Sequence, residues 1–248
     1  MTIKKSRLVA LLVLMLLSQT VWAQTSDDET DASLAVSAGA ERKLAKGLHL
    51  EAEAEVRTLS DFSNFDRWTL GVGVDYKLQS WLKADMGYSF INRYKPSHVT
   101  DKGNTRNGFW APRHRWYASL AGSYSLGRWD FALRERYQLT HAPLQYVPKY
   151  APSGKRMTDE AVGGSQEHLL RSRLAVSYNI RHCKLEPGAS IELHNDLSDG
   201  FALDEVRYAV SLDYKLSNAN KLSLTFRYTA NQGGDDACLL SAGYVYSF

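Results

Sequence analysis

The sequence predicts an all-β protein, a single antiparallel transmembrane β-barrel of about 10–12 strands with short turns at one end and longer loops at the other. Three observations point to this fold class: an export signal at the N-terminus, a repeated strand–turn–strand unit, and aromatic residues near both ends of the strands. A soluble β-sandwich also alternates polar and apolar residues and is the competing fold.

The N-terminal segment has the organisation of a secretory signal peptide. Basic residues precede an apolar run at 8–17, which is too short to span a bilayer, and cleavage is expected before Gln24. We therefore expect a signal peptide at 1–23, an acidic N-terminal tail at 24–33 and the barrel at 34–248.

The charge of the chain does not indicate nucleic-acid binding. The formal net charge of +3 comes from Lys4, Lys5 and Arg7 in the predicted signal peptide, so the remaining chain is balanced. No later segment approaches the 18 or so consecutive apolar residues that a transmembrane helix needs. If the chain crosses a membrane, it must do so with strands.

Hairpins repeat along the chain. Short turns join the two strands of each hairpin, whereas longer polar connections, above all those at 94–113 and 142–168, join successive hairpins. This arrangement is typical of membrane barrels, with short turns in the periplasm and long loops outside the cell. The hairpins are expected at 34–59, 68–93, 114–141, 169–196 and 205–231, followed by a last strand at 238–248.

The strand number is unusual. Five hairpins and one strand make 11 strands, whereas single-chain bacterial barrels have even numbers. A missed strand would give 12 and an overcounted one 10. Pro187 predicts a β-bulge, because proline cannot donate to the ladder. Glu135 falls on the apolar face of its strand, where an acidic residue is destabilising unless it lies above the hydrocarbon or a bulge shifts the register.

Alternation and aromatic placement favour the membrane barrel over the sandwich. In LHLEAEAEVRTL, Leu50 and Val56 face one side of the strand and Glu51 and Glu55 the other. Aromatic residues at two heights match the interfacial girdles of membrane barrels. Those near the short turns are Tyr76, Tyr124, Tyr178 and Tyr214, and those near the opposite ends are Trp68, Phe90, Trp116 and Tyr137.

The last strand ends in SAGYVYSF, which places Tyr244, Tyr246 and Phe248 on one face. Alternate aromatics that end in a terminal phenylalanine resemble the C-terminal assembly signal of bacterial outer-membrane proteins. This resemblance implies recognition by the barrel-assembly machinery during biogenesis.

Four segments carry a further resemblance: FDRWTLGVGVDYKL, RHRWYASLAGSYSLGRWDFALRERYQ, LLRSRLAVSYNI and EVRYAVSLDYKLSNANKLSLTFRY. Together they resemble an uncharacterised family of small outer-membrane barrels, a domain of unknown function from Gram-negative bacteria. The resemblance covers nearly the whole predicted mature chain. It implies a barrel in the outer membrane, in contact with its lipid and lipopolysaccharide, and it supplies no activity.

The inward faces of the strands collect charges of both signs. A barrel of this size leaves little free lumen, so a salt-bridged network that holds the wall of a structural or binding barrel is one interpretation, and a narrow charge-selective pore is another. The network is expected to comprise Glu51, Glu53, Glu55, Arg57, Arg134, Arg136, Arg171, Arg173, Glu192, Arg207 and Arg227, with Asp75, Lys77, Lys83, Asp85, Asp213 and Lys215 also facing inward.

A third interpretation, an outer-membrane lipid hydrolase, lacks a recognisable catalytic pair. The sequence contains no His-x-Ser, and His194 and Ser198 lie roughly 13 Å apart in an extended chain. His114, His141 and His168 fall near outer strand ends, but their spacing does not require a metal. We therefore expect no catalytic residue, cofactor or metal site.

The long loops combine aromatic and basic residues, a composition that suits glycans, phosphates or lipopolysaccharide, although no ligand can be named. The aromatic residues are Tyr94, Phe109, Trp110, Tyr146 and Tyr150, and the basic ones are Lys95, Lys102, Arg106, Lys149, Lys155 and Arg156. Cys183 lies in a short turn and Cys238 at the start of the last strand, so two free thiols are expected at opposite ends of the barrel.

Overall fold

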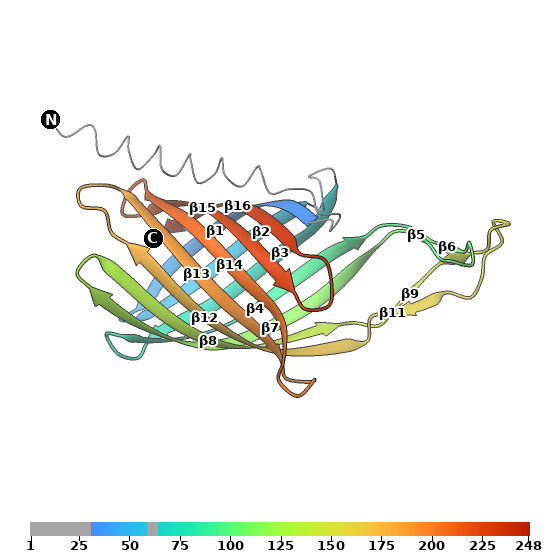
Figure 1. Cartoon of the computed structure of the whole chain (residues 1–248), viewed down its shortest axis with the longest axis horizontal. Helices are drawn as coiled ribbons and strands as arrows, with labels where there is room; N and C mark the ends of the chain where they lie inside the picture. Colours follow the sequence, from blue (N-terminus) through green and yellow to red (C-terminus); the bar gives the residue numbers. More distant parts are fainter. Residues whose placement is uncertain (1–30, 59–63) are drawn as a thin grey trace.

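The described part of the chain closes into a barrel (Figure 1). The structure, a computed structural model, describes residues 31–58 and 64–248. The predicted signal peptide at 1–23 and most of the acidic tail at 24–33 lie outside these residues, while Asp31 to Ser33 already belong to the first strand. None of the described residues forms a helix long and apolar enough to cross a membrane.

The barrel contains 11 strands, as the five hairpins and one last strand predict. Several strands extend further toward the long loops than expected, so that Phe109 and Trp110 are strand residues rather than loop residues. The barrel strands are β1 (Asp31–Ala45), β2 (Leu48–Thr58), β3 (Phe65–Lys77), β4 (Leu82–Lys95), β7 (Phe109–Leu126), β8 (Trp129–Ala142), β12 (Ser165–Tyr178), β13 (Leu185–Asp196), β14 (Ala202–Lys215), β15 (Asn220–Asn231) and β16 (Ala237–Ser247).

Closure explains how the strand number can be odd. Every neighbouring pair in the wall is antiparallel except β1 and β16, which run parallel from Asp31 opposite Ala237 to Glu41 opposite Ser247. An odd number of alternating strands necessarily brings the first and last together in the same direction. We call this pair the seam; no additional strand is needed to close the ring.

Contacts that skip a strand identify the concave inner wall. Arg136 on β8 reaches Asp85 on β4 across β7, at 3.0 Å between Nη2 and Oδ1. Arg134 on the same strand reaches Glu192 on β13 across β12, at 2.7 Å. Only side chains on the concave side of a curved sheet can bridge in this way. The alternate positions form the outer wall, which carries exposed apolar side chains such as Val72, Met86, Leu120, Leu133, Leu174, Val210 and Leu224.

Glycines on β3 and β4 allow one inward tyrosine to lie against the wall. A Cβ atom at Gly73 would lie 2.8 Å from the Tyr117 hydroxyl, and one at Gly87 would overlap the same group. The guanidinium of Arg136 stacks on the Tyr117 ring at 4.0 Å from its centroid. The glycines therefore help to fix the position of a lumen arginine.

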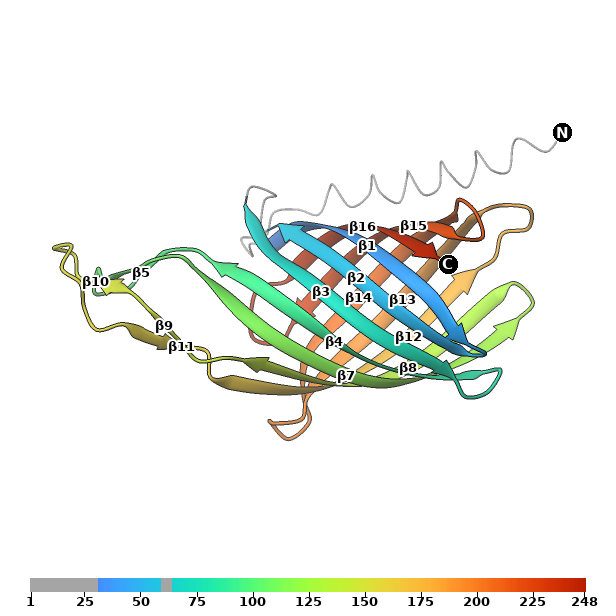
Figure 2. The same cartoon turned by 180° about the vertical axis from the view of Figure 1, so that it is seen from behind.

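The two longest loops pair with each other and extend beyond one end of the barrel (Figures 1 and 2). One small sheet contains β5 (His98–Val99), β6 (Thr105–Arg106) and β10 (Lys149–Tyr150), and another contains β9 (Gln145–Val147) and β11 (Glu160–Val162). Glu160 lies 3.3 Å from both Arg106 and Lys149, and these cations, Lys149 first, lower the pKa of its carboxyl. The predicted loops are therefore partly structured.

Two local expectations change. Pro187 does not form a bulge, because it stays in register opposite Leu212 of β14. On its other side, the pairing of β13 with β12 ends at the adjacent Gly188. The register shift of β13 lies instead between His194 and Asn195. Glu135 lies on the outer wall without a register shift, and its carboxylate accepts a hydrogen bond from Ser172 Oγ at 2.6 Å.

The predicted state of the cysteines is confirmed. Cys183 is free and exposed in the short turn between β12 and β13, and Cys238 is free near the start of β16. In these antiparallel hairpins the two positions belong to opposite ends of the barrel.

Candidate functional site: the charged lumen

Inward charges differ in type along the barrel axis. The end with short turns carries lysines and acids: Glu41, Lys43, Glu51, Asp75, Lys77, Lys83, Asp85, Asp130, Glu186, Asp213, Lys215 and Lys221. From the middle to the long-loop end the basic residues are almost all arginines. We call these the arginine zone: Arg57, Arg67, Arg93, Arg113, Arg115, Arg134, Arg136, Arg171, Arg173, Arg207 and Arg227.

Glu192 on β13 is the centre of one ion-pair cluster in this zone. Its carboxylate accepts hydrogen bonds from Arg134 Nη2 at 2.7 Å and Arg171 Nη2 at 2.6 Å. His194 Nε2 lies 2.7 Å from the same carboxylate, and His194 Nδ1 lies 2.8 Å from Glu205. Glu192 and His194 are both buried, so this cluster is screened from water by the side chains around it.

Two smaller clusters fix further arginines. Asp85 accepts hydrogen bonds from Ser119 Oγ at 2.7 Å and from Arg136 Nη2 at 3.0 Å. At the long-loop end, the buried Asp66 lies 2.8 Å from Arg93 Nε and 3.5 Å from Arg67 Nε.

Other arginines have no carboxylate partner within the described part of the chain. Arg57 donates to Ser33 Oγ, at 3.1 Å from Nη2, and Arg115 donates to Thr140 Oγ1 at 3.4 Å. Among the residues that the structure describes, Arg113, Arg173 and Arg227 make no ion pair or side-chain hydrogen bond. Like charges also face one another across the ladder, because Arg67 is paired with both Arg57 and Arg93, and Arg134 with Arg173. The zone has an excess of positive charge, because its eleven arginines outnumber the carboxylates of Glu53, Glu55, Asp66, Glu167, Glu192 and Glu205.

The structure joins only part of the network predicted from sequence. Arg134, Arg171, Glu192 and Arg207 meet in one cluster, and Arg136 belongs to another. Glu51 makes a loose ion pair with Lys83 at 3.7 Å between oxygen and nitrogen. Across residues 31–58 and 64–248, Glu53, Glu55, Arg57, Arg173 and Arg227 form no ion pair.

Sequence reasoning missed several members. Arg67 and Arg113 lay just outside the predicted strands, and Arg93 ended one of them. His194 and Glu205 were missed because a bulge follows His194 and brings Glu205 opposite it. Arg115 follows Arg113 by two residues and precedes Ser119 by four, so alternation along the strand places its side chain on the same inward face. This spacing could have identified Arg115 from the sequence.

The histidines considered for catalysis or metal binding are not assembled into such sites. Both ring nitrogens of His194 face carboxylates, while the Ser198 amide donates to Asp196, so no described contact joins His194 to Ser198. His114 and His141 lie on the outer wall with ring centroids 6.5 Å apart. His168, on the same wall, is hydrogen-bonded to the Tyr137 hydroxyl at 2.7 Å.

The aromatic C-terminus lies beside the seam. The rings of Tyr246 and Phe248 stack at 5.5 Å, and Arg42 lies over the Phe248 ring at 5.6 Å. The backbone amide of Phe248 donates to the Glu41 carbonyl at 2.9 Å. Tyr244 donates from its hydroxyl to Asn220 Oδ1 at 2.5 Å. The predicted assembly signal thus also takes part in closing the ring.

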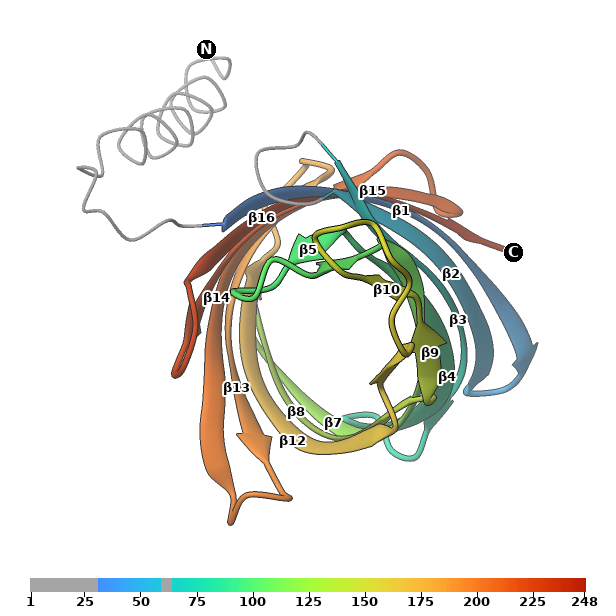
Figure 3. The same ribbon diagram turned by 90° about the vertical axis from the view of Figure 1, so that its right-hand side faces the viewer.

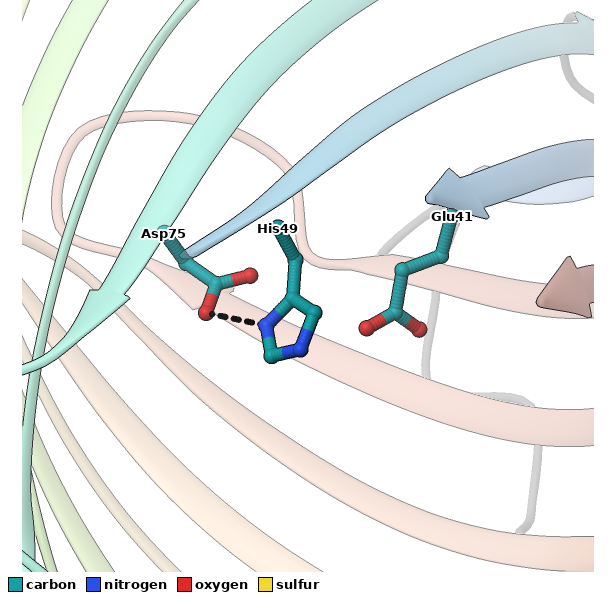
Figure 4. A group of neighbouring side chains, drawn as sticks. All are labelled: Glu41, His49 and Asp75. Carbon is teal, nitrogen blue, oxygen red and sulfur yellow. Dashed lines mark hydrogen bonds and ion pairs between the residues drawn. The ribbon is translucent and has the colours of Figure 1, made fainter. Parts of the chain in front are cut away.

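One side-chain group at the short-turn end was not foreseen as a unit (Figure 4). Glu41, His49 and Asp75 come from β1, β2 and β3, and their nitrogen and oxygen donor atoms all lie within 4.8 Å of one another. Glu41 and His49 do not belong to the predicted network, because the sequence analysis assigned no role to either.

Comparison with known proteins gives a family and a fold. Residues 36–237 match the family described as "Protein of unknown function (DUF2490)". No curated protein matches the sequence. Among solved structures, the β domain of the Bordetella autotransporter BrkA superposes with a TM-score of 0.58 at 15% identity, covering 83% of this chain and 86% of that one.

Two porin-type structures are more distant. The NanC porin has a TM-score of 0.44 at 15% identity, with 82% of this chain and 93% of that chain covered. OccAB4 of Acinetobacter baumannii has a TM-score of 0.33 at 11% identity, with 79% and 60% covered.

Replacing Glu192 by glutamine should strongly destabilise the barrel. The change removes the carboxylate charge between Arg134 and Arg171, and removing one partner of a buried ion pair typically costs about 3–5 kcal/mol. The free energy of unfolding, measured by urea titration of the refolded barrel, should fall by this amount. Glu53→Gln, at an exposed inward position, is the matched control, and equal losses in the two variants would contradict a central role for Glu192.

Proposed function

The chain belongs to the DUF2490 family, proteins of unknown function, and we propose that it is an integral outer-membrane barrel whose lumen binds and passes small anions. The observation that carries this proposal is the excess of arginines without carboxylate partners on the inner wall. Outer-membrane lipid and lipopolysaccharide would surround the barrel.

Location in the outer membrane is supported by three features. The N-terminal sequence has the organisation of a secretory signal peptide. The wall is closed and its outer face is apolar, as a β structure in lipid requires. Tyr76, Tyr124 and Tyr214 are exposed on the outer face near the short turns, and Trp116 and Tyr137 are exposed nearer the long-loop end, as interfacial girdles would be.

Anion binding follows from the chemistry of the arginine zone. A guanidinium keeps its charge at all physiological pH values and offers a planar set of donors that fits carboxylate or phosphate groups. Arg57 and Arg115 are held by neutral hydroxyls, and a positive charge in a confined lumen requires water or a counter-ion. An anion that enters from the long-loop end would meet these side chains first.

Passage through the lumen depends on the side chains that fill it, because no described backbone segment crosses the middle of the ring in the end-on view, where the paired long loops lie over its upper and right-hand parts (Figure 3). Glu51 and Lys83 are roughly half exposed although they face inward, which indicates water between the walls at the short-turn end. A salt-bridged barrel that binds anions without conducting them is the second candidate, and the buried Glu192 cluster favours it.

Conductance distinguishes these candidates. Refolded protein in a planar bilayer under a KCl gradient should conduct with a reversal potential that shows preference for chloride, because the arginine zone has excess positive charge. Replacing Arg57, Arg113 and Arg227 by glutamine should reduce that preference. Replacing Lys77, Lys215 and Lys221 by glutamine removes the same number of charges at the other end and should reduce it less.

Cation preference in the native protein would contradict the proposal, as would an equal effect of the two triple variants. Absence of conductance would reject the passing of anions and leave the non-conducting barrel.

The aromatic C-terminus is proposed to be read by the barrel-assembly machinery. Phe248→Ala should therefore lower the amount of protein in the outer membrane much more than Phe109→Ala, where the ring packs under Arg106 at the long-loop end. Quantitative immunoblotting of membrane fractions measures both. Equal amounts of the two variants would show that Phe248 is ordinary packing. A further check is refolding in detergent, where Phe248→Ala should fold nearly normally if its main role is recognition.

A further inference from the structure

The carboxylates and the imidazole at the short-turn ends of β1, β2 and β3 form a compact set of donors. His49 on β2 is directly opposite Asp75 on β3, and its Nδ1 lies 3.2 Å from Asp75 Oδ2. Glu41 on β1 lies on the other side of the imidazole, and all the donor atoms are within 4.8 Å (Figure 4). Three neighbouring strands therefore present three ligands to one small volume.

Asp75 has an unused donor atom in this group. The residue is 2% exposed, and its Oδ1 atom has no hydrogen-bond partner among the described residues. Figure 4 shows this second oxygen, which no dashed line joins, on the side of the Asp75 carboxylate that faces the His49 side chain. A buried carboxylate oxygen without a partner is energetically costly, and a bound cation would satisfy it.

The group is accessible. A cavity of about 280 Å³, lined by Glu41, Lys43, His49, Ser247 and Phe248, opens beside it. Glu41 is only partly constrained, since a single hydrogen bond of 3.3 Å from Ser247 Oγ holds its Oε2 atom. An ion can therefore reach the ligands, and Glu41 can adjust to it.

The charges around the group include both carboxylates, which attract a cation, and a lysine, which repels it. Lys83 Nζ lies 3.2 Å from Asp75 and 3.7 Å from Glu51, so one ammonium already faces two carboxylates. Lys83 is 44% exposed, however, so its ammonium can turn toward solvent while its stem stays against the wall. The negative charge of the three carboxylates, Glu41, Glu51 and Asp75, is still larger than the positive charge of this one ammonium, although Lys43 also borders the cavity.

We propose that Glu41, His49 and Asp75 form a binding site for a divalent transition-metal ion, with Zn²⁺ as the best-matched ion. An imidazole nitrogen with two carboxylates suits zinc, whereas Ca²⁺ and Mg²⁺ prefer oxygen ligands throughout. One ion binds only one nitrogen of an imidazole, so the His49 ring and the two carboxylates that flank it must reorient to reach zinc–ligand bonds of about 2.0–2.2 Å. Water would occupy the remaining positions of the ion.

The ion would also stabilise the barrel next to its seam. Glu41 lies opposite Ser247 of β16 and Glu51 of β2, so a metal bound there links β1 to β2 and β3 at the end of the parallel pair. A ligand that binds only the folded state raises its stability. Zn²⁺ should therefore raise the temperature at which the barrel unfolds.

Isothermal titration of the refolded chain with Zn²⁺ in detergent tests the site. The background carries Cys183→Ser, Cys238→Ser and His182→Asn, because His182 and Cys183 share one turn and could bind zinc themselves. We expect one ion per barrel, and at least a tenfold loss of affinity in His49→Gln and in Glu41→Gln. His98→Gln, which removes an exposed histidine of β5, should bind zinc like the parent.

Heating provides the second measurement. Zn²⁺ should raise the unfolding temperature of the parent and of His98→Gln but not of Glu41→Gln, whose folding is checked by its circular dichroism and its mobility in unboiled samples. Absence of one-to-one binding would overturn the proposal. Equal affinity in His49→Gln and His98→Gln would overturn it as well, because the zinc would then be bound elsewhere.

Discussion

The structure depends on closing one hydrogen-bonded ladder around a ring. Backbone groups at a sheet edge have no partner in lipid, so the first and last strands must pair. With 11 strands they can do so only in parallel, and β1 and β16 pair from Asp31 to Glu41 in unbroken register. Side chains pack tightly around Gly243 of β16, where a Cβ atom would lie 3.1 Å from Ser37 Oγ of β1 and 2.6 Å from Ser223 Oγ of β15.

Once the ring is closed, strand alternation determines what the lumen contains. Inward positions carry charges, and the ring brings arginines from β8 and β12 onto one carboxylate of β13. Such clusters add little net stability but fix one arrangement, because breaking them leaves unpaired charges. The arginines outside the clusters have no carboxylate partner among the described residues, and the proposed function rests on them. The proposed zinc site depends on closure in a different way, since its ligands lie beside the seam.

The sequence predicted the elements better than their contacts. Short turns, alternation and aromatic positions located the five hairpins, because these signals are local. The direction of the seam depends on the parity of the whole ring, and contacts such as His194 with Glu205 depend on a one-residue bulge. The bulge predicted at Pro187 was in the wrong place. The pairing of β13 with β12 ends at Gly188, so the missing amide hydrogen of Pro187 breaks no ladder on that side. The group of Glu41, His49 and Asp75 was missed because its members are distributed over three strand ends.

A disulfide across the seam tests the account most directly. Ala35 on β1 is paired with Ser241 on β16, and cysteines at these positions in a background without Cys183 and Cys238 should crosslink when the folded barrel is oxidised. A cysteine at Ala35 with one at Ser247 should not, because Ser247 lies six residues further along the parallel strand, opposite Glu41. We expect a bridge in the first variant alone, detected by peptide mapping without reduction. Failure of that bridge to form in folded protein, or equal crosslinking of the two variants, would contradict parallel closure of an 11-strand barrel.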